Sequence, residues 1–222
     1  MPRISDPESL PPGEALQRLI DGNRRFLSGS GRSLGREWSH ELAERAQRPF
    51  AIVLGCSDSR MPVEIVFDQG FGDLFVVRIA GNIVAPSGVG SIEFAASQFG
   101  SRLVVVMGHT RCGAVAATVK ALQTGLGPDS KNIRSITDRI APHIQGLVRP
   151  GDPEAVLREA VRANVRASVD HLRHGSRLLE ELVVGGRVAV VGAEYSLESG
   201  AVEFFDGVPP TAGPTASSAR AG

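Results

Sequence analysis

The sequence predicts an α/β fold: a single domain with a mostly parallel central β-sheet flanked by helices, an N-terminal helical arm and a short antiparallel edge strand. Four short apolar runs show no alternation with polar residues, which is typical of strands buried on both faces. Helical stretches alternate with these runs, which indicates βαβ units with right-handed crossovers. The chain has 222 residues, enough for one domain with a sizeable core.

The four apolar runs predict the strands of the parallel sheet. A fifth, short strand is expected at residues 201–205, where it could pair with residues 189–191 as an antiparallel hairpin at the sheet edge. The four runs are residues 50–55, 74–79, 103–107 and 187–192.

The helices follow from apolar residues at helical spacing. Leu16, Leu19 and Leu27 belong to a broad apolar stripe that predicts a helix over residues 13–28. This stripe could serve the chain's own core or cover a partner subunit. Further helices are predicted at residues 37–46, 90–99, 113–123, 133–148 and 153–174.

Both ends of the chain differ in composition from its centre. Residues 1–13 hold four prolines and few apolar side chains, so they predict an extended arm. The domain is expected over residues 14–207. Residues 208–222 are rich in Pro, Thr, Ala, Ser and Gly, which predicts a disordered tail.

Charge and hydropathy exclude several classes of protein. Lysine and arginine number 24, and aspartate and glutamate also number 24, so the net charge is zero. This balance argues against nucleic-acid binding. The longest apolar runs are far too short to cross a bilayer, which argues against a membrane protein. The N-terminus lacks the apolar segment of a secretory signal, so we expect a cytoplasmic protein.

The two cysteines follow predicted strands. Cys56 comes directly after the first apolar run, and His109 and Cys112 follow the third. The carboxyl ends of neighbouring parallel strands meet at one edge of a sheet, so we expect these side chains to converge with Asp58. In a reducing cytosol such a set suggests metal binding or catalysis. Two thiolates and one imidazole suit zinc and leave a fourth position open.

Two motifs together resemble the β-class carbonic anhydrases. They are CSDSR at residues 56–60 and GHTRCGA at residues 108–114. The likeness runs from residue 14 to residue 191 and includes the segments 72–78 and 92–95. It implies one zinc ion per chain and the reversible hydration of CO2 to bicarbonate and a proton by a zinc-bound hydroxide.

The resemblance also implies a role for each residue of the metal site. Cys56, His109 and Cys112 would be the three constant zinc ligands. Asp58 would be either the fourth ligand or, when displaced, the acceptor for the zinc-bound water. Arg60 would pair with Asp58 and pull it off the metal, so that these two residues gate the fourth position. Activity is then expected to rise with pH.

The substrate pocket is likewise implied by the resemblance. Gln47 matches the family's substrate-binding glutamine, and Phe75, Ala80 and Phe94 would line an apolar CO2 pocket. Phe94 stands where plant-type members carry a tyrosine. The family's site lies at a dimer interface, so we expect a homodimer or a dimer of dimers in which Gln47 and Phe94 serve different protomers' metals.

Four alternatives stay open at this stage. The same zinc site could hydrolyse carbonyl sulfide or carbon disulfide. A non-catalytic zinc module would hold Asp58 as a permanent fourth ligand. A nucleotide-binding protein is disfavoured, because the glycines at residues 88–90 lack a third glycine where Glu93 stands. A cysteine hydrolase using Cys112 with His109 is disfavoured, since their close spacing suits chelation better than proton relay.

Overall fold

The fold centres on a five-stranded sheet. The structure is a computed structural model that describes residues 9–31, 41–44 and 46–210. The strand order is β2-β1-β3-β4-β5, and every neighbouring pair is parallel except β4 and β5. The strands are β1 (Ala51–Gly55), β2 (Leu74–Arg78), β3 (Leu103–His109), β4 (Ala189–Tyr195) and β5 (Val202–Asp206).

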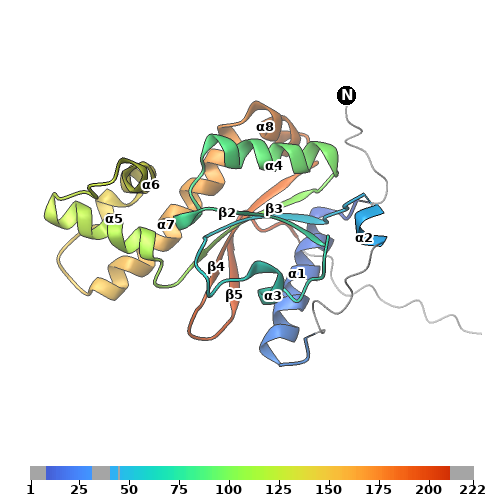
Figure 1. The fold of residues 1–222 in the computed structure, drawn as a ribbon, viewed down its shortest axis with the longest axis horizontal. Helices are drawn as coiled ribbons and strands as arrows, with labels where there is room; N and C mark the ends of the chain where they lie inside the picture. Colours follow the sequence, from blue (N-terminus) through green and yellow to red (C-terminus); the bar gives the residue numbers. More distant parts are fainter. Residues whose placement is uncertain (1–8, 32–40, 45, 211–222) are drawn as a thin grey trace, which may run out of the picture.

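Helices cover both faces of the sheet (Figure 1). Alternate residues of the central strands point to opposite faces. Ile52 and Val104 pack toward α4, α7 and α8, whereas Val53 and Val105 pack toward α1 and α3. The helices are α1 (Pro12–Leu27), α2 (Glu41–Glu44), α3 (Val63–Val66), α4 (Pro86–Gln98), α5 (Gly113–Thr124), α6 (Lys131–Ile144), α7 (Pro153–His174) and α8 (Arg177–Val184), with 3-10 turns η1 (Ala80–Asn82) and η2 (Gln145–Leu147).

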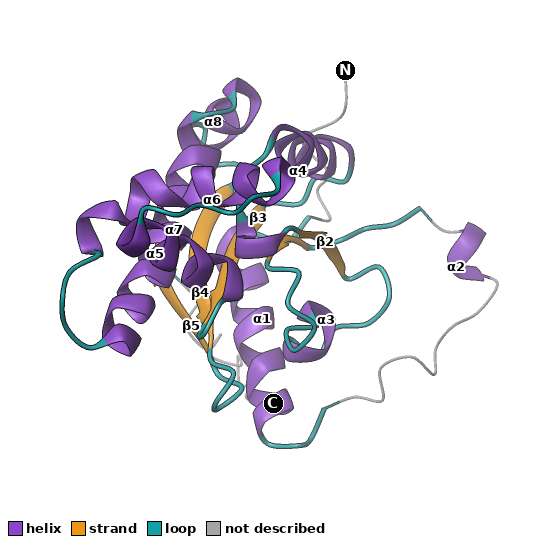
Figure 2. Cartoon of the chain, turned by 60° about the vertical axis from the view of Figure 1, so that its left-hand side comes forward, coloured by secondary structure: helices purple, strands orange, loops and turns teal. Residues whose placement is uncertain are grey.

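Helices α5 and α6 pack beside α7, as the view rotated by 60° shows (Figure 2). α5 begins four residues after the end of β3, so its N-terminus lies at the carboxyl edge of the sheet. This is the edge where the sequence places its metal-binding side chains.

The predicted fold class is confirmed, and the differences concern individual elements. β2 is only half-buried, because it is the edge strand of the sheet and has a neighbour on one side only. β5 pairs with Gly192–Tyr195 rather than with residues 189–191, because β4 runs on to Tyr195 before the chain turns. The short helices α3 and α8 were not predicted.

Some predictions fall mainly outside the residues that the structure describes. Of the helix predicted at residues 37–46, the described part is helical at Glu41–Glu44. Residues 1–8 of the predicted arm and 211–222 of the predicted tail are not described. The boundaries of arm, domain and tail therefore stay predictions. Within the described ranges, no helix combines the length and the apolar character that crossing a membrane requires.

The first part of the apolar stripe of α1 is buried in the chain's own core, whereas Leu27 at its end is exposed. Leu16 and Leu19 are fully buried against the face of the sheet that α1 covers. Asn23 adds a polar connection: its amide nitrogen donates to the carbonyls of Val66 and Gly200, and its oxygen accepts from the N–H of Val202. α1 is thus tied to both α3 and the β4–β5 hairpin.

We expect Leu19→Ala to destabilise the protein by about 2–5 kcal/mol, because it opens a cavity in a fully buried site. Leu27→Ala on the same helix is the matched control. Leu27 is 47% exposed, so its loss should cost less than about 1 kcal/mol. Urea unfolding of both variants measures the difference, and equal small effects would contradict the core role of α1.

Candidate metal centre

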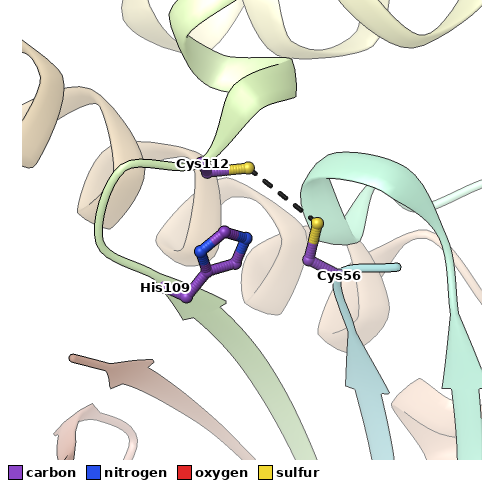
Figure 3. A group of neighbouring side chains, drawn as sticks. All are labelled: Cys56, His109 and Cys112. Atoms are coloured by element: carbon purple, nitrogen blue, oxygen red, sulfur yellow. Dashed lines mark hydrogen bonds between the residues drawn. The ribbon is translucent and has the colours of Figure 1, made fainter. Parts of the chain in front are cut away.

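Three potential metal ligands meet at the carboxyl edge of two neighbouring strands. Cys56 follows the last residue of β1, His109 is the last residue of β3, and Cys112 caps the N-terminus of α5. β1 and β3 pair in parallel, with Gly55 opposite Met107. The three side chains point toward one another from these elements (Figure 3).

The geometry of the cluster fits one zinc ion. The two sulfur atoms are 3.9 Å apart, close to the separation of about 3.8 Å that two Zn–S bonds of about 2.3 Å give in a tetrahedral site. The ligand atoms of Cys56, His109 and Cys112 all lie within 4.8 Å of one another, and all three residues are buried.

His109 is oriented as a metal-binding histidine would be. Its Nδ1 lies 2.9 Å from the carbonyl of Thr110, to which it can donate. Its Nε2 is buried and has no hydrogen-bond partner. A buried nitrogen without a partner is costly, and a metal ion would satisfy it, with the Nδ1 bond fixing the tautomer.

The local electrostatics favour a thiolate at Cys56. Hydrogen bonding from Cys112, supported by His109 and the N–H of Gly81, lowers the pKa of the Cys56 thiol to about 4 despite its burial. Donation to Cys56, together with burial, raises the pKa of Cys112. Burial works to lower the pKa of His109, but the attraction of the neighbouring Cys56 thiolate outweighs it, so the pKa of His109 is raised. The negative charge of the cluster is therefore centred on Cys56.

Asp58 lies at the edge of this cluster and is paired with Arg60. The guanidinium donates to both carboxylate oxygens, at 2.9 and 2.8 Å, and the backbone N–H of Arg60 donates to Oδ1 at 3.0 Å. The Arg60 guanidinium holds the pKa of Asp58 well below its usual range. Oδ2 of Asp58 still lies 3.9 Å from Nε2 of His109, so the carboxylate borders the metal position.

The loops that carry the ligands are held by residues that sequence reasoning did not assign. Arg78, the last residue of β2, donates to the carbonyls of Cys56 and Asp58. Glu198 accepts from the Thr110 hydroxyl at 2.6 Å and pairs with Arg111 at 2.9 Å. Arg78 stands out in the sequence as a charged residue at the end of a predicted strand, which suggests an anion or a carboxylate as its partner, but its partners here are backbone carbonyls. Nothing in the sequence links Glu198 to residues 110–111.

The comparisons with known proteins agree with this site. The family model for carbonic anhydrase matches residues 51–202, which include all three candidate ligands. The chain belongs to the β class of the carbonic anhydrase family. It is accordingly an enzyme, and its Cys-His-Cys cluster is typical of the zinc sites of that class.

Similar proteins cover nearly the whole chain. Carbonic anhydrase 2 of Mycobacterium tuberculosis is 36% identical over 88% of this chain and 93% of its own length. The carbonic anhydrase of Mycolicibacterium smegmatis is 41% identical over 87% and 93%. Among solved structures, a tetrameric β-carbonic anhydrase of Sordaria macrospora has a TM-score of 0.67 at 21% identity, covering 86% of this chain and 96% of that one. The last comparison supports the fold alone.

The four predicted substrate residues are not all near the cluster of their own chain. Ala80 lies in η1, one residue before the Gly81 N–H that contacts Cys56. Phe75 pairs with Ile52, four residues or about 13 Å before Cys56 along β1. Phe94 is 52% exposed on α4, and Gln47 is exposed ahead of β1. Their roles at the substrate therefore stay predictions.

Proposed function

We propose that this carbonic anhydrase hydrates CO2 reversibly at a zinc ion held by Cys56, His109 and Cys112, with Asp58 and Arg60 controlling the fourth position. The observation that carries the proposal is the bidentate pairing of Asp58 with Arg60 beside a three-ligand cluster. A carboxylate engaged in this way leaves the fourth position to water. When bound, zinc would activate that water for attack on CO2.

Asp58 has the charge state needed to orient a water molecule. Because the pKa of its carboxyl is held well below the usual range by Arg60, Asp58 is a carboxylate from mildly acidic to alkaline pH. It can accept a hydrogen from a water beside Nε2 of His109, from which it lies 3.9 Å. This contact would aim the oxygen lone pair at the substrate carbon.

The same pairing disfavours a closed, structural zinc site. Such a site would need the Asp58 carboxylate as a permanent fourth ligand, yet three hydrogen bonds hold it to Arg60. An arginine aimed at a structural ligand would weaken the site without benefit. No contact in the described residues favours carbonyl sulfide or carbon disulfide over CO2.

The decisive experiment combines zinc analysis with stopped-flow CO2 hydration across pH. We expect one zinc per chain and a rate that rises from mildly acidic to alkaline pH, because water competes better for the fourth position as its deprotonation becomes easier. A flat profile would contradict the gating by Asp58 and Arg60. Faster sulfide release from carbonyl sulfide than CO2 hydration would overturn the substrate assignment.

We further propose that the active form is a homodimer or a dimer of dimers. The support is the position of Gln47, Phe75 and Phe94, which are exposed or half-buried and lie away from their own cluster. In a dimer these residues could complete the partner's pocket. Light scattering coupled to size exclusion is expected to give a dimer or tetramer mass, and a monodisperse monomer with full activity would contradict this arrangement.

A further inference from the structure

Two successive hydrogen bonds connect the Cys56 sulfur to α7, a helix that contributes none of the candidate ligands. The backbone N–H of Gly81 donates to Sγ of Cys56 at 3.2 Å. The carbonyl of the same glycine accepts from Nδ2 of Asn164 on α7 at 2.8 Å. Both backbone groups of Gly81 are therefore engaged: its N–H by the Cys56 sulfur and its carbonyl by Asn164.

The surroundings of Gly81 leave this turn little freedom. Its φ is +70°, a conformation that other residues rarely adopt, and an added Cβ would lie 2.9 Å from Cδ1 of Ile140 and 3.0 Å from Cβ of Ala114. Asn164 is only 2% exposed. One turn further along α7, the Ser168 hydroxyl donates to the next carbonyl, that of Asn82, at 3.2 Å.

We propose that Asn164 is a positioning residue for the metal centre: by holding the carbonyl of Gly81, it keeps the Gly81 N–H on the Cys56 sulfur. An N–H donor withdraws negative charge from a thiolate, and hydrogen bonds to ligating sulfurs tune the metal that they bind. Helix α7 thereby sets how strongly Cys56 donates charge to zinc. The inference rests on the proposed zinc site and adds a determinant outside its ligands.

The test replaces zinc with cobalt and compares Asn164→Ala with the unsubstituted enzyme. In Asn164→Ala the Gly81 carbonyl is no longer held, so the Gly81 N–H can leave the Cys56 sulfur. Loss of this N–H donor raises the energy of the sulfur electrons, and the thiolate-to-cobalt absorption band should move to longer wavelength. CO2 hydration by the zinc form should fall about tenfold in kcat/KM, as expected for a lost second-layer partner. The rate should also reach its half-maximum at higher pH, because a more strongly donating thiolate makes the metal a weaker Lewis acid.

Ser168→Ala is the matched control, since it removes a hydroxyl from the same helix and the same 3-10 turn but leaves Gly81 bonded. We expect its cobalt band and pH profile to match those of the unsubstituted enzyme. An equal shift in Ser168→Ala would show general loosening of the turn and overturn the specific role of Asn164. An unshifted band in metal-loaded Asn164→Ala would overturn it as well.

Two further measurements keep the test decisive if Asn164→Ala folds poorly. Asn164→Leu restores side-chain volume without the donor, and a cavity of about 240 Å³ beside Asn164 and Ser168 gives it room. It should show the same band shift. In the unsubstituted enzyme loaded with ¹¹³Cd, the Gly81 amide proton should show scalar coupling to the metal across the hydrogen bond, and its absence would refute the proposal. Inactivity of the unsubstituted zinc enzyme would instead refute the proposed function.

Discussion

Cys112→Ala is expected to lose zinc and CO2 hydration together. Cys112 is 1% exposed and is one of the three ligands that cluster among the described residues, so its loss leaves Cys56 and His109 as an incomplete set. We expect kcat/KM to fall by more than about 100-fold, beyond the effect of removing a partner outside the ligands. Metal analysis of the purified variant and stopped-flow hydration measure the two losses.

The control for this variant is Val115→Ala, which lies on the same helix and is equally buried. Val115 has no metal-binding atom, so its truncation should lower thermal stability while zinc content stays near one per chain. Circular dichroism establishes that both variants are folded. Full zinc occupancy with unchanged turnover in Cys112→Ala would remove Cys112 from the metal centre.

The clustering of the ligands could be predicted because it depends on strand ends. Cys56 and His109 follow or end continuous apolar runs, and the carboxyl ends of adjacent parallel strands necessarily lie together. The exposure of β2 could not be predicted in the same way. Its apolar run resembles that of β1, and only the strand order shows that β2 is an edge strand.

The residues that support the ligands were hidden from sequence reasoning for a different reason. Asn164 contacts Gly81 across 83 positions of the chain. Helical spacing places it on the buried stripe of α7, between Val161 and Val165, but nothing in the sequence indicates which group it contacts. Glu198 reaches Thr110 across 88 positions. Such contacts depend on how α7 and the β4–β5 turn pack on the sheet, which hydropathy does not encode.

The predicted roles of the substrate residues depend on the family resemblance and not on the geometry of the chain. Nothing in the spacing of Gln47, Phe75 or Phe94 indicates a substrate pocket, and Phe75 lies beside Ile52, away from the end of β1 that Cys56 follows. Phe75 and Phe94 both lie beside Phe99, with ring centroids 6.0 and 5.5 Å from it.

Mixing two inactive variants, one lacking a ligand and one altered at Phe94, would test whether a pocket is shared between protomers, since mixed dimers should regain activity.

Arg60→Ala is expected to retain zinc but to lose about 10- to 100-fold in kcat/KM near neutral pH. Without the guanidinium, the backbone N–H of residue 60 is the one hydrogen-bond donor that the described residues leave to the Asp58 carboxylate. Its pKa should rise toward the ordinary value, and its carboxylate is free to occupy the fourth metal position. Metal analysis and stopped-flow hydration across pH follow both effects.

The pH profile separates this gating from a simple loss of structure. Because Asp58 would then compete directly with water, part of the Arg60→Ala activity should return at alkaline pH, where water competes better. Arg60→Lys should recover less than full activity, because an ammonium cannot replace the bidentate pair. Arg177→Ala, which breaks an exposed pair with Glu181 on α8, should leave zinc content and rate unchanged. Full turnover of Arg60→Ala at every pH would show that Asp58 needs no restraint to leave the metal open.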